Sequence, residues 1–234
     1  MKLTLRSLGG AETVTGSKHL IDADGTRVLV DCGLFQGLKH LRERNWAPLP
    51  VPPDSIDAIV LTHAHLDHSG YLPKLVHDGF RGVAHCTAAT ADLCEILLKD
   101  SAQIAEKDAE YANRKGYSKH EPALPLYTMR DAERALKHLK QVPLGAEFDI
   151  ARDFGLKFRR AGHILGAATA EVKVGGMTLV FSGDLGRYGD PVMHDPEPIA
   201  RADYVVVEST YGDRAHAKTD PMAELGDIIE RTVR

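Results

Sequence analysis

The sequence contains few cysteines, few aromatic residues and no long apolar run. Its 234 residues include three cysteines, Cys32, Cys86 and Cys94, and none belongs to a C-x-x-C pair. This scarcity argues against a disulfide scaffold or a cysteine-based zinc site, and it favours a reducing compartment. No apolar segment approaches the ~18 residues that a membrane span needs, and the first residues lack the apolar core of a signal peptide. We therefore expect a cytoplasmic protein that does not enter a membrane.

An excess of charge of one sign is also absent. Lysine and arginine total 29 while aspartate and glutamate total 33, which gives a net charge of −4 and an isoelectric point near 6.3. This balance argues against a protein that coats nucleic acid, although it leaves room for a local basic groove. With 43% hydrophobic and 26% charged residues, the chain has the composition of a globular protein with a substantial core.

Apolar runs and turn residues predict a layered α/β fold. We expect helices over 90–113, 128–141 and 220–234, and a shorter helix that begins at the N-cap Ser69 and ends at Gly79. Apolar runs predict strands at residues 3–8, 18–22, 27–30, 57–62, 147–150, 156–160, 169–174, 177–181 and 204–207. This order of strands, helices, strands and a final helix predicts sheets with helices outside.

The most informative segment is His63-Ala64-His65-Leu66-Asp67-His68, which follows the apolar run at 58–61. Side chains alternate along a strand, so His63 and His65 point the same way at its end. Asp67 and His68 then turn with the chain toward the helix that follows. Imidazole and carboxylate together suit zinc, and also manganese or iron. A polar loop with satisfied histidines is the alternative, but four potential ligands in six residues argue against it.

Three further polar residues follow apolar strands in glycine-containing turns. They are Asp31 before Cys32-Gly33, His163 within 161–167, and Asp184 within 182–186. Taken alone, each is more often a turn residue than a functional one. Their shared position at strand ends makes them candidates to complete a metal site, since zinc needs three or four ligands.

The H-x-H-x-D-H signature, with these three residues around it, resembles the metallo-β-lactamase fold. The resemblance implies a four-layer αββα sandwich with two metal ions, zinc first and manganese as the alternative, at one edge of its paired sheets. It implies that His63, His65 and His163 bind the first metal, that Asp67 and His68 bind the second, and that Asp184 bridges them. Asp31 would orient a ligand histidine or the loop.

Other segments resemble the β-CASP branch of that superfamily. They are 8–17, Leu34-Phe35-Gln36-Gly37, 162–167, 182–187 and Glu208-Ser209-Thr210-Tyr211-Gly212, which resembles the branch's motif A. The resemblance implies a metal-dependent phosphodiesterase, an endo- or exonuclease that acts on RNA or in some members on DNA, in RNA processing or degradation. Asp67 would orient or deprotonate the attacking water, and Glu208 would support the acid step.

The resemblance also predicts the domain organisation. In β-CASP nucleases a second domain follows motif A and contributes two further histidines. We expect residues 1–207 to form the metallo-β-lactamase-fold domain, incomplete, and 208–234 to be motif A and the first helix leading toward a β-CASP domain that is missing. Neither His194 nor His216 has a matching context. The chain is therefore expected to be a fragment, an engineered domain or one part of a split protein, with weak or absent nuclease activity.

Several residues are expected to have other roles. We expect Trp46 to be a core anchor, and His19 to be an ordinary surface or core histidine. Arg187 and Arg214 are candidate phosphate contacts. The alternative for Glu208 is a strand-end acid near Arg214.

Two other functions stay open. One is a small-molecule hydrolase on the same fold, such as a thioesterase, lactonase or β-lactamase; motif A and the glycine-rich opening argue against it. The other is a non-catalytic scaffold or binding subunit, against which the full set of core ligands argues. The unpartnered apolar face of the last helix also leaves a homo-oligomer open.

Overall fold

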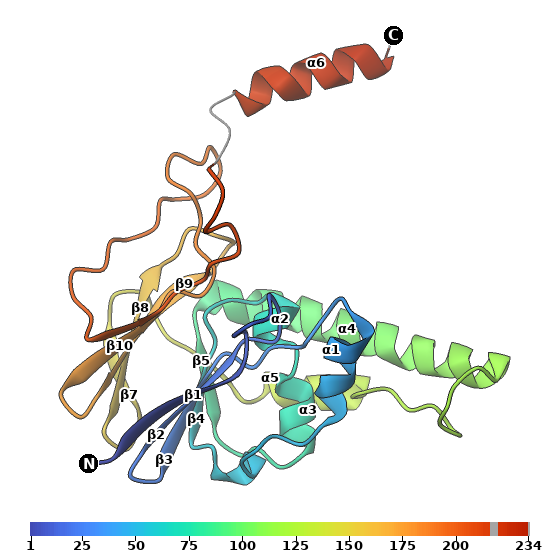
Figure 1. Ribbon diagram of the computed structural model, residues 1–234, viewed down its shortest axis with the longest axis horizontal. Helices are drawn as coiled ribbons and strands as arrows, with labels where there is room; N and C mark the ends of the chain where they lie inside the picture. The colour runs from blue at the N-terminus through green and yellow to red at the C-terminus, as the bar shows by residue number, and fades with distance from the viewer. Residues whose placement is uncertain (216–219, 234) are drawn as a thin grey trace.

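The computed structural model describes residues 1–215 and 220–233, so His216 and Arg234 lie outside the described residues. Two β-sheets form the centre, and helices pack on the first of them (Figure 1). The last helix, α6 (Pro221–Val233), stands away from both sheets, and its side chains at 222–233 are exposed. Helix, sheet and sheet are three of the four predicted layers, and the layered α/β class is confirmed.

The first sheet has six strands in the order β1-β2-β3-β4-β5-β6. β1 to β3 pair antiparallel, and β3 to β6 pair parallel. Parallel strands place their carboxyl ends at one edge of the sheet, where loops can gather side chains. The bounds are β1 (Leu3–Gly9), β2 (Lys18–Ala23), β3 (Thr26–Val30), β4 (Ala58–Val60), β5 (Val83–Cys86) and β6 (Leu139–Gln141).

The second sheet has five strands in the order β11-β10-β9-β8-β7. Its neighbouring strands pair antiparallel, except that the edge strand β11 pairs parallel with β10. Gly175 and Gly176, both with positive φ, form the β9–β10 hairpin turn that their sequence predicts. The bounds are β7 (Glu147–Ala151), β8 (Phe154–Arg160), β9 (Ala168–Val174), β10 (Met177–Phe181) and β11 (Tyr204–Val206).

The alternation of side chains divides the core into two clusters. Leu20, Leu29 and Ile59 face the helices. Their strand neighbours Ile21 and Val28 face the second sheet. Because the central strands are covered on both faces, they consist almost wholly of apolar residues, which is why the sequence predicts them well.

Helices cover the first sheet from one side. α4 begins after Thr87, whose hydroxyl accepts from the Thr90 amide at 3.3 Å, and ends at the left-handed Gly116. α5 begins with the capping box that Thr128 and Asp131 predict. The helices are α1 (Lys39–Glu43), α2 (Leu66–Ser69), α3 (Leu72–His77), α4 (Ala88–Lys115) and α5 (Met129–Leu136), with short 3-10 turns at Arg44–Trp46 and Pro53–Ser55. None of these helices, nor α6, is long and apolar enough to cross a membrane.

Several local predictions are wrong. Ser69 does not cap a helix: it ends α2, and its hydroxyl donates to the carbonyls of Ala64 and His65. The helix predicted over 128–141 ends at Leu136, because 139–141 join the first sheet as β6. Trp46 is 55% exposed and is not a core anchor. The short elements α1 and β5 lack a pattern long enough to be recognised.

Gly33 provides a direct test of how closely the segments around the hexapeptide pack. A Cβ atom at this position would lie 1.6 Å from the carbonyl oxygen of Asp67, a backbone atom that cannot move aside. We predict that Gly33→Ala lowers the free energy of unfolding by at least about 2 kcal/mol. Gly155→Ala is the control, because its Cβ would meet its nearest neighbour at 3.6 Å. Chemical denaturation measures both, and equal midpoints would contradict the prediction.

Candidate metal centre

The predicted ligands converge at one edge of the two sheets. Asp31 directly follows β3, and the hexapeptide follows β4 by two residues. His163 and Asp184 come from the second sheet, after β8 and β10 respectively. The structure therefore brings together residues up to 153 positions apart in the sequence, Asp31 and Asp184, from four strand ends.

Three imidazoles and one carboxylate form the centre of this cluster. His63 Nε2 lies 3.1 Å from His65 Nδ1, and His163 Nε2 lies 3.3 Å from the same atom. Asp184 Oδ2 lies 3.4 Å from His163 Nε2, and all four ligand atoms lie within 4.8 Å of one another. Two nitrogens bound to one tetrahedral zinc at 2.0–2.1 Å are roughly 3.3 to 3.4 Å apart. The donor set therefore fits a zinc ion.

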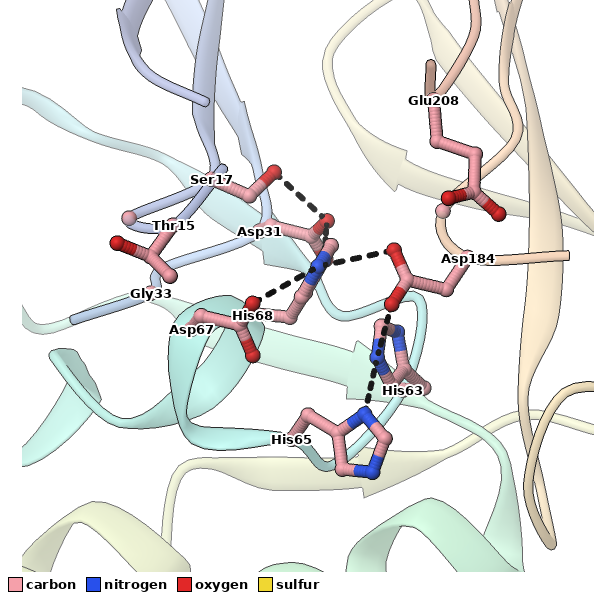
Figure 2. Close-up of polar contacts among 12 residues, drawn as sticks. Thr15, Ser17, Asp31, Gly33, His63, His65, Asp67, His68, Asp184 and Glu208 are labelled. Carbon is pink, nitrogen blue, oxygen red and sulfur yellow. Dashed lines mark hydrogen bonds and ion pairs between the residues drawn. The ribbon is translucent and has the colours of Figure 1, made fainter. Parts of the chain in front are cut away.

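A second group of ligands lies on the other side of Asp184. Its Oδ1 is 3.2 Å from His68 Nε2, while Oδ2 faces His63 and His163. Asp67 Oδ2 is 3.9 Å from the same His68 nitrogen. Figure 2 shows Asp184 between His63 and His68, with one oxygen directed at each. This is the position required of a carboxylate that bridges two cations.

Asp31 lies behind His68 and is only 2% exposed. Its Oδ2 accepts from His68 Nδ1 at 2.7 Å and from the Ser17 hydroxyl at 3.2 Å. Its Oδ1 accepts from the Thr62 amide at 2.9 Å and from the Thr62 hydroxyl at 3.0 Å. The bond to Nδ1 fixes the ring so that Nε2 faces Asp184, as an outer carboxylate does for many metal-binding histidines. Asp31 thus positions the ring of His68.

Burial and charge set the protonation of the ligands. Burial lowers the pKa of His63 to about 3, so this imidazole is neutral, the form that binds metals. Burial also acts to lower the pKa of His68, but Asp31 and Asp184 outweigh it and raise the value to about 10. Burial favours the neutral form of Asp184, yet His68 brings the pKa of that carboxyl down to about 2. A metal ion on His68 Nε2 would take the place of this proton.

Backbone hydrogen bonds fix the hexapeptide against its neighbours. The Ser17 amide donates to the Asp67 carbonyl at 2.9 Å, and the Cys32 amide donates to the His68 carbonyl at 2.7 Å. The Leu34 amide donates to the Leu66 carbonyl at 2.8 Å. The glycine-rich opening and the 31–34 segment therefore hold the loop through the backbone.

Glu208 lies apart from the ligands. Its Oε1 accepts from the Leu185 amide at 2.6 Å, and its own amide donates to the Ser182 hydroxyl at 3.0 Å. The carboxylate thus anchors the loop that carries Asp184 (Figure 2). The alternative interpretation of Glu208 is an acid near Arg214. Among the described residues Glu208 and Arg214 form no ion pair, and Arg214 instead pairs with Asp213 at 3.7 Å.

Supporting residues were harder to find from the sequence than the ligands. Ser17 and Thr62 hold Asp31, yet hydroxyl residues next to glycines or strand ends give no distinctive pattern. His19, expected to be an ordinary histidine, lies 3.4 Å from the Ser17 hydroxyl. Its position two residues after Ser17 on β2 is the only sequence signal for this contact.

The histidine triad generates a prediction about metal uptake. The chain should bind zinc, and His63→Ala or His163→Ala should lower the zinc content of the purified protein to below about half. His40→Ala is the control, because His40 is exposed on α1 and forms no hydrogen bond or ion pair with His63, His65, His163 or Asp184. Elemental analysis after dialysis against zinc measures the content. Variants that retain as much zinc as the control would refute the triad.

Glu208 generates a second prediction. Glu208→Ala removes the acceptor for the Leu185 amide, whereas Glu208→Gln keeps a carbonyl oxygen in its place. We expect the Leu185 amide to exchange its hydrogen about tenfold faster in the alanine variant and at a near-normal rate in the glutamine variant. Amide exchange followed by NMR measures the rate. Unchanged exchange in Glu208→Ala would mean that this contact does not hold the loop.

Comparison with known proteins agrees with this geometry. The model of the family described as "Metallo-beta-lactamase superfamily" matches residues 16–222. The chain is 40% identical over 226 residues to Ribonuclease TTHA0252 of Thermus thermophilus, covering 96% of this chain and 48% of the relative. It is 35% identical over 241 residues to Transcription termination factor FttA of Methanothermobacter thermautotrophicus, covering 98% and 35%.

A third relative is Cleavage and polyadenylation specificity factor 73 of Drosophila melanogaster, 29% identical over 222 residues and covering 93% of this chain and 30% of the relative. The chain thus spans about half of the first of these relatives and about a third of the other two. These relatives are β-CASP proteins, so the resemblance drawn from the motifs is confirmed. With the family model matching most of its length, the chain belongs to the metallo-β-lactamase superfamily.

Proposed function

We propose that this chain is the metal-binding part of a β-CASP-type phosphodiesterase that cleaves RNA. The observation that carries the proposal is the position of Asp184, with one oxygen toward His63 and His163 and the other toward His68. A pair of cations held in this way suits an in-line displacement at phosphorus. The 40% identity to a relative named as a ribonuclease supports RNA as the substrate, with single-stranded DNA as the alternative.

Six side chains would hold the metal, for which zinc is the first choice and manganese the second. The first ion would bind to His63, His65 and His163, the second to Asp67 and His68, and Asp184 would bind both. When bound, two such ions supply positive charge for the phosphoryl oxygens and make a water molecule more acidic. Imidazole-rich ligation favours zinc over magnesium or calcium, which prefer oxygen ligands.

The roles of the surrounding residues follow from their contacts. Among the residues that the structure describes, the Asp67 carboxylate pairs only with His68, through Oδ2 at 3.9 Å, so its other oxygen would orient a water and accept its proton. Asp31 keeps His68 in place. Glu208 holds the loop of Asp184 through the Leu185 amide. Because its carboxylate is engaged there, a second group would be needed to protonate the leaving oxygen.

Two hollows meet at Asp184 and suggest where the substrate lies. One, of about 350 Å³, reaches from His68 and Asp184 to Glu12 and Glu208. The other extends from His163 and Asp184 toward Arg187 and Tyr211. Asp184 and Glu208 line both hollows, but no lysine or arginine of the described residues lines the first, whereas Arg187 and the exposed ring of Tyr211 line the second. We therefore place the phosphate chain on the Arg187 side. This extends the predicted phosphate role of Arg187.

The domain organisation is part of the proposal. Residues 1–207 would form the metallo-β-lactamase-fold domain, and 208–234 would begin the connection to a β-CASP domain. Relatives two to three times longer than their match support this division, as do the exposed apolar side chains of α6, which include Leu225, Ile228 and Ile229. A second copy of the chain is the alternative cover for that helix. We place the protein in the cytoplasm.

The test uses a phosphodiester that needs no acid step. Bis(p-nitrophenyl) phosphate releases a phenolate that leaves without being protonated, so the zinc-loaded chain should hydrolyse it even where RNA cleavage is weak. Asp67→Asn should lower this rate at least about 100-fold. Asp100→Asn, an exposed carboxylate on α4, is the control and should keep the full rate.

Two results would contradict the proposal. One is hydrolysis of an ester or lactam without turnover of either bis(p-nitrophenyl) phosphate or RNA, which would favour a small-molecule hydrolase. The other is phosphodiester hydrolysis that survives in Asp67→Asn, which would remove the assigned role of Asp67.

A further inference from the structure

His19 is a buried histidine that the proposed reaction does not use. It lies at the start of β2, is 8% exposed, and its ring centroid is 5.8 Å from that of Phe181 in the second sheet. Ile21, two residues further along β2, belongs to the apolar cluster between the sheets. The position of His19 on the strand is therefore one where an apolar side chain would fit, and a polar ring there calls for a reason.

Both ring nitrogens of His19 have partners. Nδ1 lies 2.9 Å from the hydroxyl of Ser7, which is the cross-strand partner of His19 in the β1–β2 pair. Nε2 lies 3.4 Å from the hydroxyl of Ser17. The Ser17 hydroxyl in turn lies 3.2 Å from Asp31 Oδ2, the oxygen that accepts from His68 Nδ1. A continuous chain of hydrogen bonds thus runs from β1 to the ligand His68.

The direction of this chain is determined by its end. The Asp31 carboxylate only accepts, so Ser17 must donate its single hydroxyl proton to it. The Ser17 oxygen can then accept from His19 Nε2–H, and His19 Nδ1 can accept from the Ser7 hydroxyl. This arrangement needs a neutral His19, and burial lowers its pKa in agreement. One tautomer of His19 satisfies every contact in the chain.

Ser17 explains why a histidine is needed at this distance. Its backbone is already fixed, because its amide donates to Asp67 and its carbonyl accepts from the Gly33 amide at 3.0 Å. What stays free is rotation of the side chain about the Cα–Cβ bond, which places Oγ, and rotation about the Cβ–Oγ bond, which places the proton. The N–H of His19 holds Oγ in place and favours the rotation in which the Ser17 proton points at Asp31, so it acts on both side-chain rotations that the fixed backbone leaves open.

We propose that His19 is a positioning residue for the second metal subsite: through the Ser17 hydroxyl it fixes Asp31, and through Asp31 the ring of His68. The proposal rests on the metal assignment made above for His68. Outer hydrogen-bond partners of metal ligands typically contribute about 10- to 100-fold to metal affinity. His19 acts one bond further out, so we place its effect at the lower end of this range.

Three variants test the proposal on the full chain loaded with zinc. His19→Leu removes both ring nitrogens but fills the apolar space beside Phe181. His19→Gln keeps an N–H donor near the position of Nε2. His85→Leu is the matched control, because His85 is also buried in the first sheet, on β5, and its Nδ1 has no hydrogen-bond partner within residues 1–215 and 220–233.

Competition with a chromophoric chelator gives the number of zinc ions and the dissociation constant of each. We expect His19→Leu to weaken one of the two zinc ions, the one we assign to the subsite of His68, about 10-fold and the other by less than about threefold. We expect His19→Gln and His85→Leu to leave both constants within about threefold of the unmodified chain. Equal constants for His19→Leu and the unmodified chain, or equal weakening by His85→Leu, would overturn the proposal.

The ring proton on His68 Nδ1 gives a second readout that a general loss of stability would not move selectively. Its hydrogen bond to Asp31 should give a slowly exchanging NMR signal in the unmodified chain and in His19→Gln. Faster exchange is expected in His19→Leu, and an unchanged rate would overturn the proposal even if only one zinc binds. An unmodified chain that takes up no zinc would instead refute the metal assignment itself, so the two failures are distinguishable.

Discussion

The hydrogen-bonded carboxylate of Asp31 is the interaction on which the rest of the site depends. A buried charge without partners is costly, and here four hydrogen bonds from Thr62, Ser17 and His68 compensate it. Those partners come from the segment after β4, the glycine-rich opening and the hexapeptide, so one carboxylate fixes the relative position of three loops. Its strained backbone, with φ of 60°, is tolerated because aspartate enters the left-handed region more readily than most residues.

The sheets supply the remaining constraint. Strands of both sheets end at the same edge, and the loops that follow carry ligands from each sheet, so the site spans the inter-sheet core. Movement of one sheet relative to the other would separate Asp184 from His63 and His68. Phe158 and Phe181, fully buried between the sheets, therefore support the site as well as the fold.

The cluster of side chains at the common edge of the sheets could be predicted from the sequence because its chemistry is unusual in its context. His63, His65 and Asp67 follow an apolar strand too closely to be ordinary loop residues, and His163 and Asp184 stand alone in glycine turns after strands. The pattern of apolar and polar residues in the sequence does not indicate which distant residues come into contact in the fold. Short elements such as β5 and β6 exist because neighbouring strands pair with them. The contacts of Glu208 with Leu185 and of His19 with Ser7 join residues 23 and 12 positions apart. Ser69 follows propensity rules for a cap, yet packing placed it at the end of α2.

The central claim is that the two sheets hold a pair of metal ions at their common edge, bridged by Asp184. The most direct measurement is an anomalous difference map at the zinc absorption edge from crystals grown with zinc. The account predicts one peak among His63, His65 and His163, and a second beside Asp67 and His68. A map with no peak among the three histidines, or with zinc bound only at other surfaces of the molecule, would contradict it.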